Sequence, residues 1–143
     1  DGARALKASI ETLPDAWNFY ITSSRTLPRL LPHDQKHDPA MTPLLWPFST
    51  AMGRAGGAVP SDWLPNDGLV NTVSARYPAG APHTDFAPGQ TPQRGVWQVL
   101  PVEELDHLAA IGGVMNTGVV RTRMFYRRIM ALLDAAAVAG ANS

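Results

Sequence analysis

The sequence has no cysteine and no net charge, and each absence excludes a class of function. Without a thiol, the chain can form neither disulfides nor a thiolate zinc site, and it offers no cysteine nucleophile. Its twelve basic and twelve acidic side chains balance, which argues against a nucleic-acid partner. No apolar run approaches the roughly eighteen residues that a transmembrane helix needs. The N-terminal segment also lacks the basic and apolar regions of a signal peptide.

What the sequence does contain is typical of one globular domain. An apolar fraction of 45% over 143 residues is enough for a hydrophobic core. Thirteen prolines and twelve glycines fall mostly between residues 28 and 101, which predicts a loop-rich middle. Prolines recur throughout residues 27–65, so we expect a surface excursion there, with a short helix within 41–52.

Hydrophobic spacing predicts two helices and three strands. The helices are expected over 1–13 and 118–138, a strand over 16–24, and short strands or extended segments over 68–75 and 95–101. A helix followed by a strand is typical of α/β proteins. Five apolar residues of the second helix should face a core: Val120, Met124, Ile129, Leu132 and Leu133. Its four arginines should face solvent: Arg121, Arg123, Arg127 and Arg128.

Two titratable residues stand near the predicted strands. Asp67 lies in Asn-Asp-Gly, which on its own is typical of a tight turn. His107 follows Asp106 and precedes an apolar segment, where a purely structural histidine is common. In α/β hydrolases the triad acid, the histidine and a final helix follow one another in the chain. Asp67, His107 and the helix from residue 118 have this order, so a catalytic acid–base pair is the second interpretation.

The segments around both residues resemble a known family. "WLPNDGLVNTVSARYP", "GVWQVLP", "DHLAAIG" and "RMFYRRI" are similar to the C-terminal part of bacterial secreted triacylglycerol lipases of the Bacillus and Staphylococcus type. The resemblance covers nearly all of the chain and is weakest from Leu27 to Pro60. It implies an α/β-hydrolase fold, with a mostly parallel central sheet flanked by helices. Residues 1–143 would form the C-terminal half of a single domain, with residues 27–65 as a Pro-rich loop excursion within it.

The resemblance also implies residue roles. Asp67 would be the acid of a Ser-His-Asp triad, and His107 its general base. The carboxylate orients the imidazole, which accepts the serine proton and returns it to the leaving alcohol. The family presents its serine in a Gly-x-Ser-x-Gly elbow, but none of the seven serines here has glycine two positions away on both sides. We therefore expect a companion N-terminal chain that carries the nucleophile, cleavage of a secreted precursor, and an ester or lipid substrate.

No metal site or cofactor is expected. His33 and His37 are four residues apart, as in zinc proteases, but the prolines on both sides leave room for little more than one helical turn. This favours a solvated polar loop. Related lipases bind calcium through an acid two positions after the histidine and another a few residues on. This chain has Ala109 and Val114-Met115 there, so the calcium site should not carry over.

An aromatic and methionine-rich group among the prolines has two interpretations. Its members are Met41, Trp46, Phe48 and Met52. They could anchor the loop to the core, or they could line part of an acyl-chain pocket beside the histidine.

Three functions are open on the sequence alone. The preferred hypothesis is a carboxylic-ester hydrolase, a secreted lipase, that forms a covalent acyl-serine intermediate. The alternative is a non-catalytic binding subunit that keeps the hydrolase fold, because the serine motif is missing. A polyester hydrolase with the same triad is the third.

Overall fold

A computed structural model describes most of the chain, which divides into two compact units. The described ranges are 10–29, 34–55, 58–87, 89–112 and 119–141. Unit 1 comprises residues 1–21, 76–101 and 129–143. Unit 2 comprises residues 22–75 and 102–128, and it contains both Asp67 and His107.

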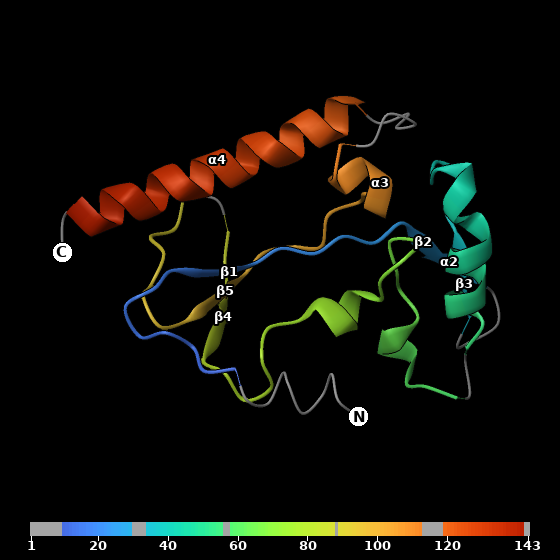
Figure 1. The fold of residues 1–143 in the computed structure, drawn as a ribbon, viewed down its shortest axis with the longest axis horizontal. Helices are drawn as coiled ribbons and strands as arrows, with labels where there is room; N and C mark the ends of the chain where they lie inside the picture. The colour runs from blue at the N-terminus through green and yellow to red at the C-terminus, as the bar shows by residue number, and fades with distance from the viewer. Residues whose placement is uncertain (1–9, 30–33, 56–57, 88, 113–118, 142–143) are drawn as a thin grey trace. The chain divides into compact units, whose positions relative to one another are not determined.

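Unit 1 is built on a three-stranded parallel sheet (Figure 1). In spatial order its strands are β1 (Asn18–Tyr20), β5 (Trp97–Val99) and β4 (His83–Asp85). The central strand β5 pairs in parallel with both neighbours, so Gln98 has a strand partner on each side. The strands predicted over 16–24 and 95–101 are confirmed as β1 and β5, at shorter length.

Aromatic side chains form much of the core of unit 1. Phe19 packs edge-to-face on Phe86 with ring centroids 5.8 Å apart, and Tyr20 packs on Tyr77 in the same way at 5.9 Å. Tyr20 and Phe86 are buried. Aromatic residues favour the extended backbone because their rings pack against neighbours on the pleated surface. This packing therefore supports the strand at β1.

Unit 2 combines a β-hairpin with short helices. The antiparallel pair is β2 (Thr26–Pro28) and β3 (Gln35–His37). The helices are η1 (Pro43–Leu45), α2 (Trp46–Gly53), η2 (Ser61–Trp63), η3 (Thr72–Ala75) and α3 (His107–Ala110). Pro43 and Pro47 lie in the first turns of η1 and α2, where proline is tolerated because its missing N–H would have no helical acceptor. The short helix predicted within 41–52 is confirmed.

Two predicted elements are not formed as expected. Residues 68–75 are not a strand, because they turn after Asp67 and continue into η3. The Asp67 side chain accepts hydrogen bonds from nearby backbone N–H groups, which competes with an extended ladder. Residues 10–13 are not helical either, and the rest of the helix predicted over 1–13 lies outside the described residues.

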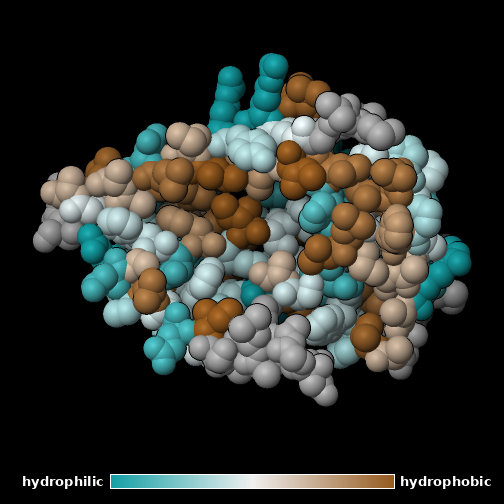
Figure 2. All heavy atoms as spheres, viewed as in Figure 1, coloured by the Kyte–Doolittle hydropathy of each residue, from teal (hydrophilic) through white to brown (hydrophobic). Residues whose placement is uncertain are grey.

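The long C-terminal helix predicted over 118–138 is confirmed as α4 (Val119–Ala141), but its buried face differs from the prediction. Three residues expected in the core are exposed: Val120, Met124 and Leu133. The buried positions are Thr122, Leu132 and Ala136. Apolar residues occur around much of the helix and remain visible along it in Figure 2, so a helical period alone fits more than one face. The four arginines are exposed, as predicted.

In the part of the chain that the structure describes, none of the helices has the length and apolar character needed to cross a bilayer.

Candidate active site

The carboxylate of Asp67 is held by the turn in which it lies. Its Oδ1 accepts hydrogen bonds from the backbone N–H groups of Leu69 (3.0 Å) and Val70 (2.8 Å). The Asp67 N–H in turn donates to the Val70 oxygen at 3.1 Å. Only 7% of Asp67 is exposed. One carboxylate oxygen is thus occupied by the turn, and the orientation of the other oxygen is fixed.

That second oxygen faces His107. Asp67 Oδ2 lies 2.9 Å from His107 Nδ1, and the backbone N–H of His107 donates to the Asp67 carbonyl oxygen, also at 2.9 Å. An ionised carboxylate only accepts hydrogen bonds, so Nδ1 donates and Nε2 keeps its lone pair. The His107 side chain is 33% exposed. A ring in this arrangement can accept a proton at Nε2 from a group that approaches from outside.

Gly68 allows the turn that contains Asp67, called the acid turn below, to pack closely against η1. Its φ is 103°, in the left-handed region that favours glycine. A β-carbon at this position would lie 2.7 Å from Cβ of the buried Leu45. The position therefore requires glycine both for its backbone conformation and for the close approach of Leu45.

The buried residue Asn66 stabilises the same turn by hydrogen bonds to its backbone. It is fully buried, and its side-chain N–H group donates to the Leu64 oxygen at 2.9 Å. Its Oδ1 accepts the N–H of Gly68 at 3.0 Å, and its backbone oxygen accepts the N–H of Arg25 at 2.8 Å. Sequence reasoning missed this residue. The Asn-Asp pair in the sequence could have indicated its role, because both side chains readily form hydrogen bonds to nearby backbone groups.

Asp106, next to His107 in the chain, is another acid to consider as its partner, but its contacts differ from those of Asp67. It is buried, and its Oδ2 accepts both the N–H (2.8 Å) and the Oγ1–H (2.9 Å) of Thr42. Its Oδ1 accepts the Ala109 N–H at 2.8 Å. Asp62, another alternative, is exposed in η2. Of these three acids, Asp67 is the one that is hydrogen-bonded to the imidazole, within the described residues.

The residues considered for metal binding are not gathered into a site. His33 lies outside the described residues, and His37 Nδ1 lies 3.2 Å from Thr50 Oγ1 while its ring stacks on Trp46. In the described ranges, no three His, Asp or Glu side chains are grouped so that they could hold an ion. Val114 and Met115 are also outside the described residues.

The aromatic and methionine-rich group divides between core and surface. Met41 is buried, and its carbonyl oxygen accepts a hydrogen bond from Trp46 Nε1 at 2.9 Å. Trp46 is 37% exposed and Phe48 is 54% exposed. Met41 therefore anchors the segment to the core, whereas Phe48 stays available as a contact for an apolar ligand.

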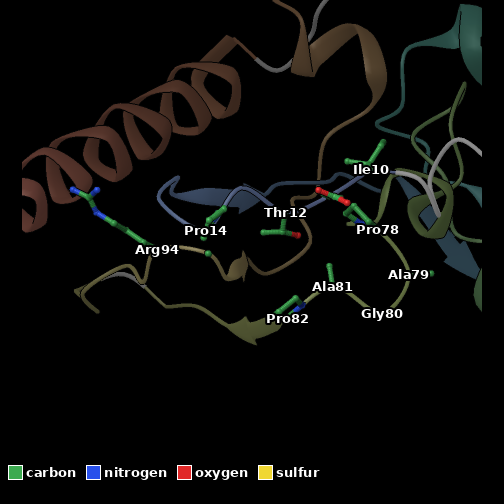
Figure 3. Close-up of a pocket in the computed structure, with 11 residues that line it drawn as sticks. Ile10, Thr12, Pro14, Pro78, Ala79, Gly80, Ala81, Pro82 and Arg94 are labelled. Atoms are coloured by element: carbon green, nitrogen blue, oxygen red, sulfur yellow. The ribbon is translucent and has the colours of Figure 1, made fainter.

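A pocket of about 580 Å³ in unit 1 is separate from these residues (Figure 3). It is lined by parts of 10–14 and 78–82 together with Arg94 and Gly95. The guanidinium of Arg94 lies 4.4 Å from the centroid of the Trp17 ring. Asp67 and His107 are not among the lining residues, so the candidate active site is the acid–base pair of unit 2 and not this pocket.

Comparison with known proteins supplies the context for this pair. Residues 5–137 match a family model described as "Lipase-like, C-terminal domain". Lipase 1 of Staphylococcus aureus is 30% identical over 124 residues, which are 86% of this chain and 17% of that protein. A lipase of Staphylococcus epidermidis is 33% identical over 78 residues, or 54% of this chain and 11% of that protein. The chain thus spans less than a fifth of the length of these curated relatives.

Solved structures agree on the fold. The lipase of Staphylococcus hyicus has a TM-score of 0.80 at 24% identity, over 92% of this chain and 34% of that one. Lipase 1 from Pelosinus fermentans has a TM-score of 0.64 at 29% identity, over 93% of this chain and 36% of that one. The predicted fold class is confirmed: the chain has the C-terminal portion of an α/β-hydrolase fold.

Proposed function

Because the chain belongs to the family of lipase-like C-terminal domains, we propose that it forms part of a carboxylic-ester hydrolase that acts through a Ser-His-Asp triad. In this proposal Asp67 is the acid and His107 is the general base. The observation that carries the proposal is the 2.9 Å contact between Asp67 Oδ2 and His107 Nδ1. The role of the acid requires this geometry, since it must hold the imidazole with Nε2 free to accept a proton.

The reaction then follows from the position of the proton. Nε2 of His107 takes the proton of a serine hydroxyl as the serine oxygen attacks the ester carbonyl carbon. The resulting tetrahedral intermediate collapses, the bond to the alcohol oxygen breaks, and Nε2 returns the proton to the leaving alcohol. A water molecule repeats the sequence on the acyl-serine and releases the carboxylic acid. Asp67 stabilises the imidazolium in both halves of the reaction.

The serine is proposed to come from a companion polypeptide outside these residues. None of the seven serines lies in a Gly-x-Ser-x-Gly elbow, and the matched region is 17% of the length of Lipase 1 from Staphylococcus aureus. Among the described strands, β1 has a partner only on its β5 side. A strand of the companion polypeptide that paired on the other side of β1 would continue the sheet across two polypeptides and bind them firmly.

The proposed substrate is an ester with an apolar acyl chain, and the protein is proposed to act outside the cell. Leu69, two residues after Asp67, is 46% exposed, and Ile111, four residues after His107, is 62% exposed. Apolar side chains that flank the reactive pair favour an apolar substrate over a small polar ester. A polyester presents the same bond, and the rates on emulsified triglyceride and on insoluble polyester distinguish these two substrates.

Labelling with a fluorophosphonate tests this proposal, because the reagent reacts with activated serines. The assembled enzyme, defined as this chain together with the polypeptide that supplies the serine, should be labelled outside these 143 residues. Labelling should depend on His107, since a serine without its base is a weak nucleophile. A label on Ser74, or ester turnover by this chain alone, would contradict the divided triad. An assembled enzyme that neither reacts nor hydrolyses esters would instead favour a binding subunit.

A further inference from the structure

The geometry points to Asp106 and Thr42 as positioning residues of the candidate active site. We propose that their contact sets the distance between the His107 imidazole and the Asp67 carboxylate. The proposal rests on the proposed function for its effect on catalysis, but the contact itself can be tested separately. The hydrogen bonds of the Thr42 and Asp106 side chains do not go to the imidazole. We therefore expect both residues to act through the backbone that carries the ring.

The contact between Thr42 and Asp106 is buried in unit 2. Thr42 is 1% exposed and Asp106 is 4% exposed. A single carboxylate oxygen, Oδ2, receives both donors of Thr42, at 2.8 Å from the backbone N–H and 2.9 Å from the hydroxyl. A buried carboxylate without such donors would be costly, because desolvation penalises its charge. The donors of Thr42 therefore determine where Asp106 can lie.

Asp106 fixes the backbone of His107 in turn. It is the N-cap of α3, and its Oδ1 accepts the Ala109 N–H at 2.8 Å. His107 is the first residue of that helix. The far end of α3 is also fastened, since Thr122 Oγ1 donates to the Ala109 oxygen at 3.0 Å. The helix that carries the imidazole is thus held at both ends, and Asp106 holds the end at which His107 lies.

The segment 42–45 also supports the acid. The N–H of Leu45 donates to the Thr42 oxygen at 2.9 Å, which closes the segment into a tight turn. Leu45 is buried against Gly68, the residue that follows Asp67. The segment therefore touches the histidine side through Asp106 and the acid side through Gly68. A common support of this kind can fix the separation of two side chains that are 40 residues apart in the chain.

Three threonine variants of the assembled enzyme test the proposal. Thr42→Val keeps the shape of the side chain and removes the hydroxyl, whereas Thr42→Ser keeps the hydroxyl. Thr50→Val is the matched control, because it removes a hydroxyl from the contact with His37 in the same unit. Asp106→Asn, which keeps the side-chain volume, replaces Thr42→Val if that variant does not fold.

The kinetic readout is turnover of a soluble nitrophenyl ester. A shift of about 1 Å in a catalytic group can cost about 100-fold in rate. We expect Thr42→Val to lower kcat by about tenfold to 100-fold with KM nearly unchanged. Thr42→Ser should retain most of the rate, and Thr50→Val should match the parent. Equal losses in Thr42→Val and Thr50→Val, or a parent-like kcat in Thr42→Val, would overturn the proposal.

A second readout does not depend on catalysis. The proton on His107 Nδ1 should give a low-field NMR signal while it is bonded to the Asp67 carboxylate. This signal should shift or broaden in Thr42→Val and stay in place in Thr50→Val. An unchanged signal in Thr42→Val would overturn the positioning role. If Asp67→Asn left ester turnover intact, the role of Asp67 in the proposed function would fail, but the NMR comparison would still decide whether Thr42 positions the ring.

Discussion

His107 is joined to Asp67 by two hydrogen bonds, one through its backbone N–H to the Asp67 carbonyl oxygen and one through its ring Nδ1 to Asp67 Oδ2, each at 2.9 Å. The backbone bond fixes where α3 begins relative to the acid turn. The side-chain bond fixes the orientation of the imidazole. The two contributions can therefore be separated by substitution, since a change to the carboxylate leaves the backbone bond in place.

Asp67→Asn should leave the assembled enzyme folded while lowering kcat by about 10⁴-fold, because an amide presents the wrong partner to the ring N–H. Ester turnover measures the rate, and circular dichroism checks the fold. Asp62→Asn is the matched control, since Asp62 is exposed in η2. A near-normal rate in Asp67→Asn would move the acid to another residue.

His107→Ala should reduce turnover at least as much as Asp67→Asn does, because it removes the proposed base itself. His83→Ala in unit 1 is the control. The His83 ring stacks on Tyr77 and is exposed, so its loss should leave kcat near the parent value. A rate in His107→Ala within tenfold of the parent would remove His107 from the mechanism.

Gly68→Ala should destabilise the fold. Its positive φ costs a residue with a side chain about 1–2 kcal/mol, and the clash with Leu45 should add about 1–3 kcal/mol. Gly80→Ala isolates the first effect, because Gly80 has a φ of 81° and nothing within 4 Å of an added β-carbon. Denaturant unfolding of both variants measures the difference in free energy. Equal losses would show that contact with Leu45 has no energetic consequence.

Calcium should not stabilise the segment around His107. Ala109 stands where related lipases are expected to have a carboxylate ligand, and an alanine side chain has no oxygen to offer a hard cation. Treatment with EDTA should thus leave the melting temperature of the assembled enzyme nearly unchanged. A large fall that added calcium reverses would be inconsistent with this expectation. Reversal by zinc alone would report on another site.

The acid and the histidine could be predicted from the sequence because their order in the chain and their neighbours carry the information. The confirmed family match spans residues 5–137, which include both residues. The roles of Asp67 and His107 stay predictions until they are tested. The strand predicted over 68–75 was wrong for a local reason. The Asp67 side chain accepts hydrogen bonds from the Leu69 and Val70 N–H groups, which would otherwise be available to a neighbouring strand. The alternation of apolar and polar residues carries no information about such side-chain hydrogen bonds.

Other features depend on contacts between distant parts of the chain. Thr42 and Asp106 are 64 residues apart, and neither local sequence contains a signal that pairs them. The face of α4 that is buried could not be chosen from its periodicity, because the apolar residues cover more than one face and burial depends on what packs against them. The proline-rich excursion was predicted, but the hairpin β2–β3 within it was not.

The position of β1 at the edge of its sheet has a consequence for handling the protein. Among the described strands β1 lies at the edge of its sheet, and its sequence has no charged residue or proline that would discourage pairing with another edge. Copies of this chain produced alone should therefore self-associate as their concentration rises. Co-expression with the proposed companion polypeptide should suppress this, because a strand of that polypeptide would cover the edge before two copies meet.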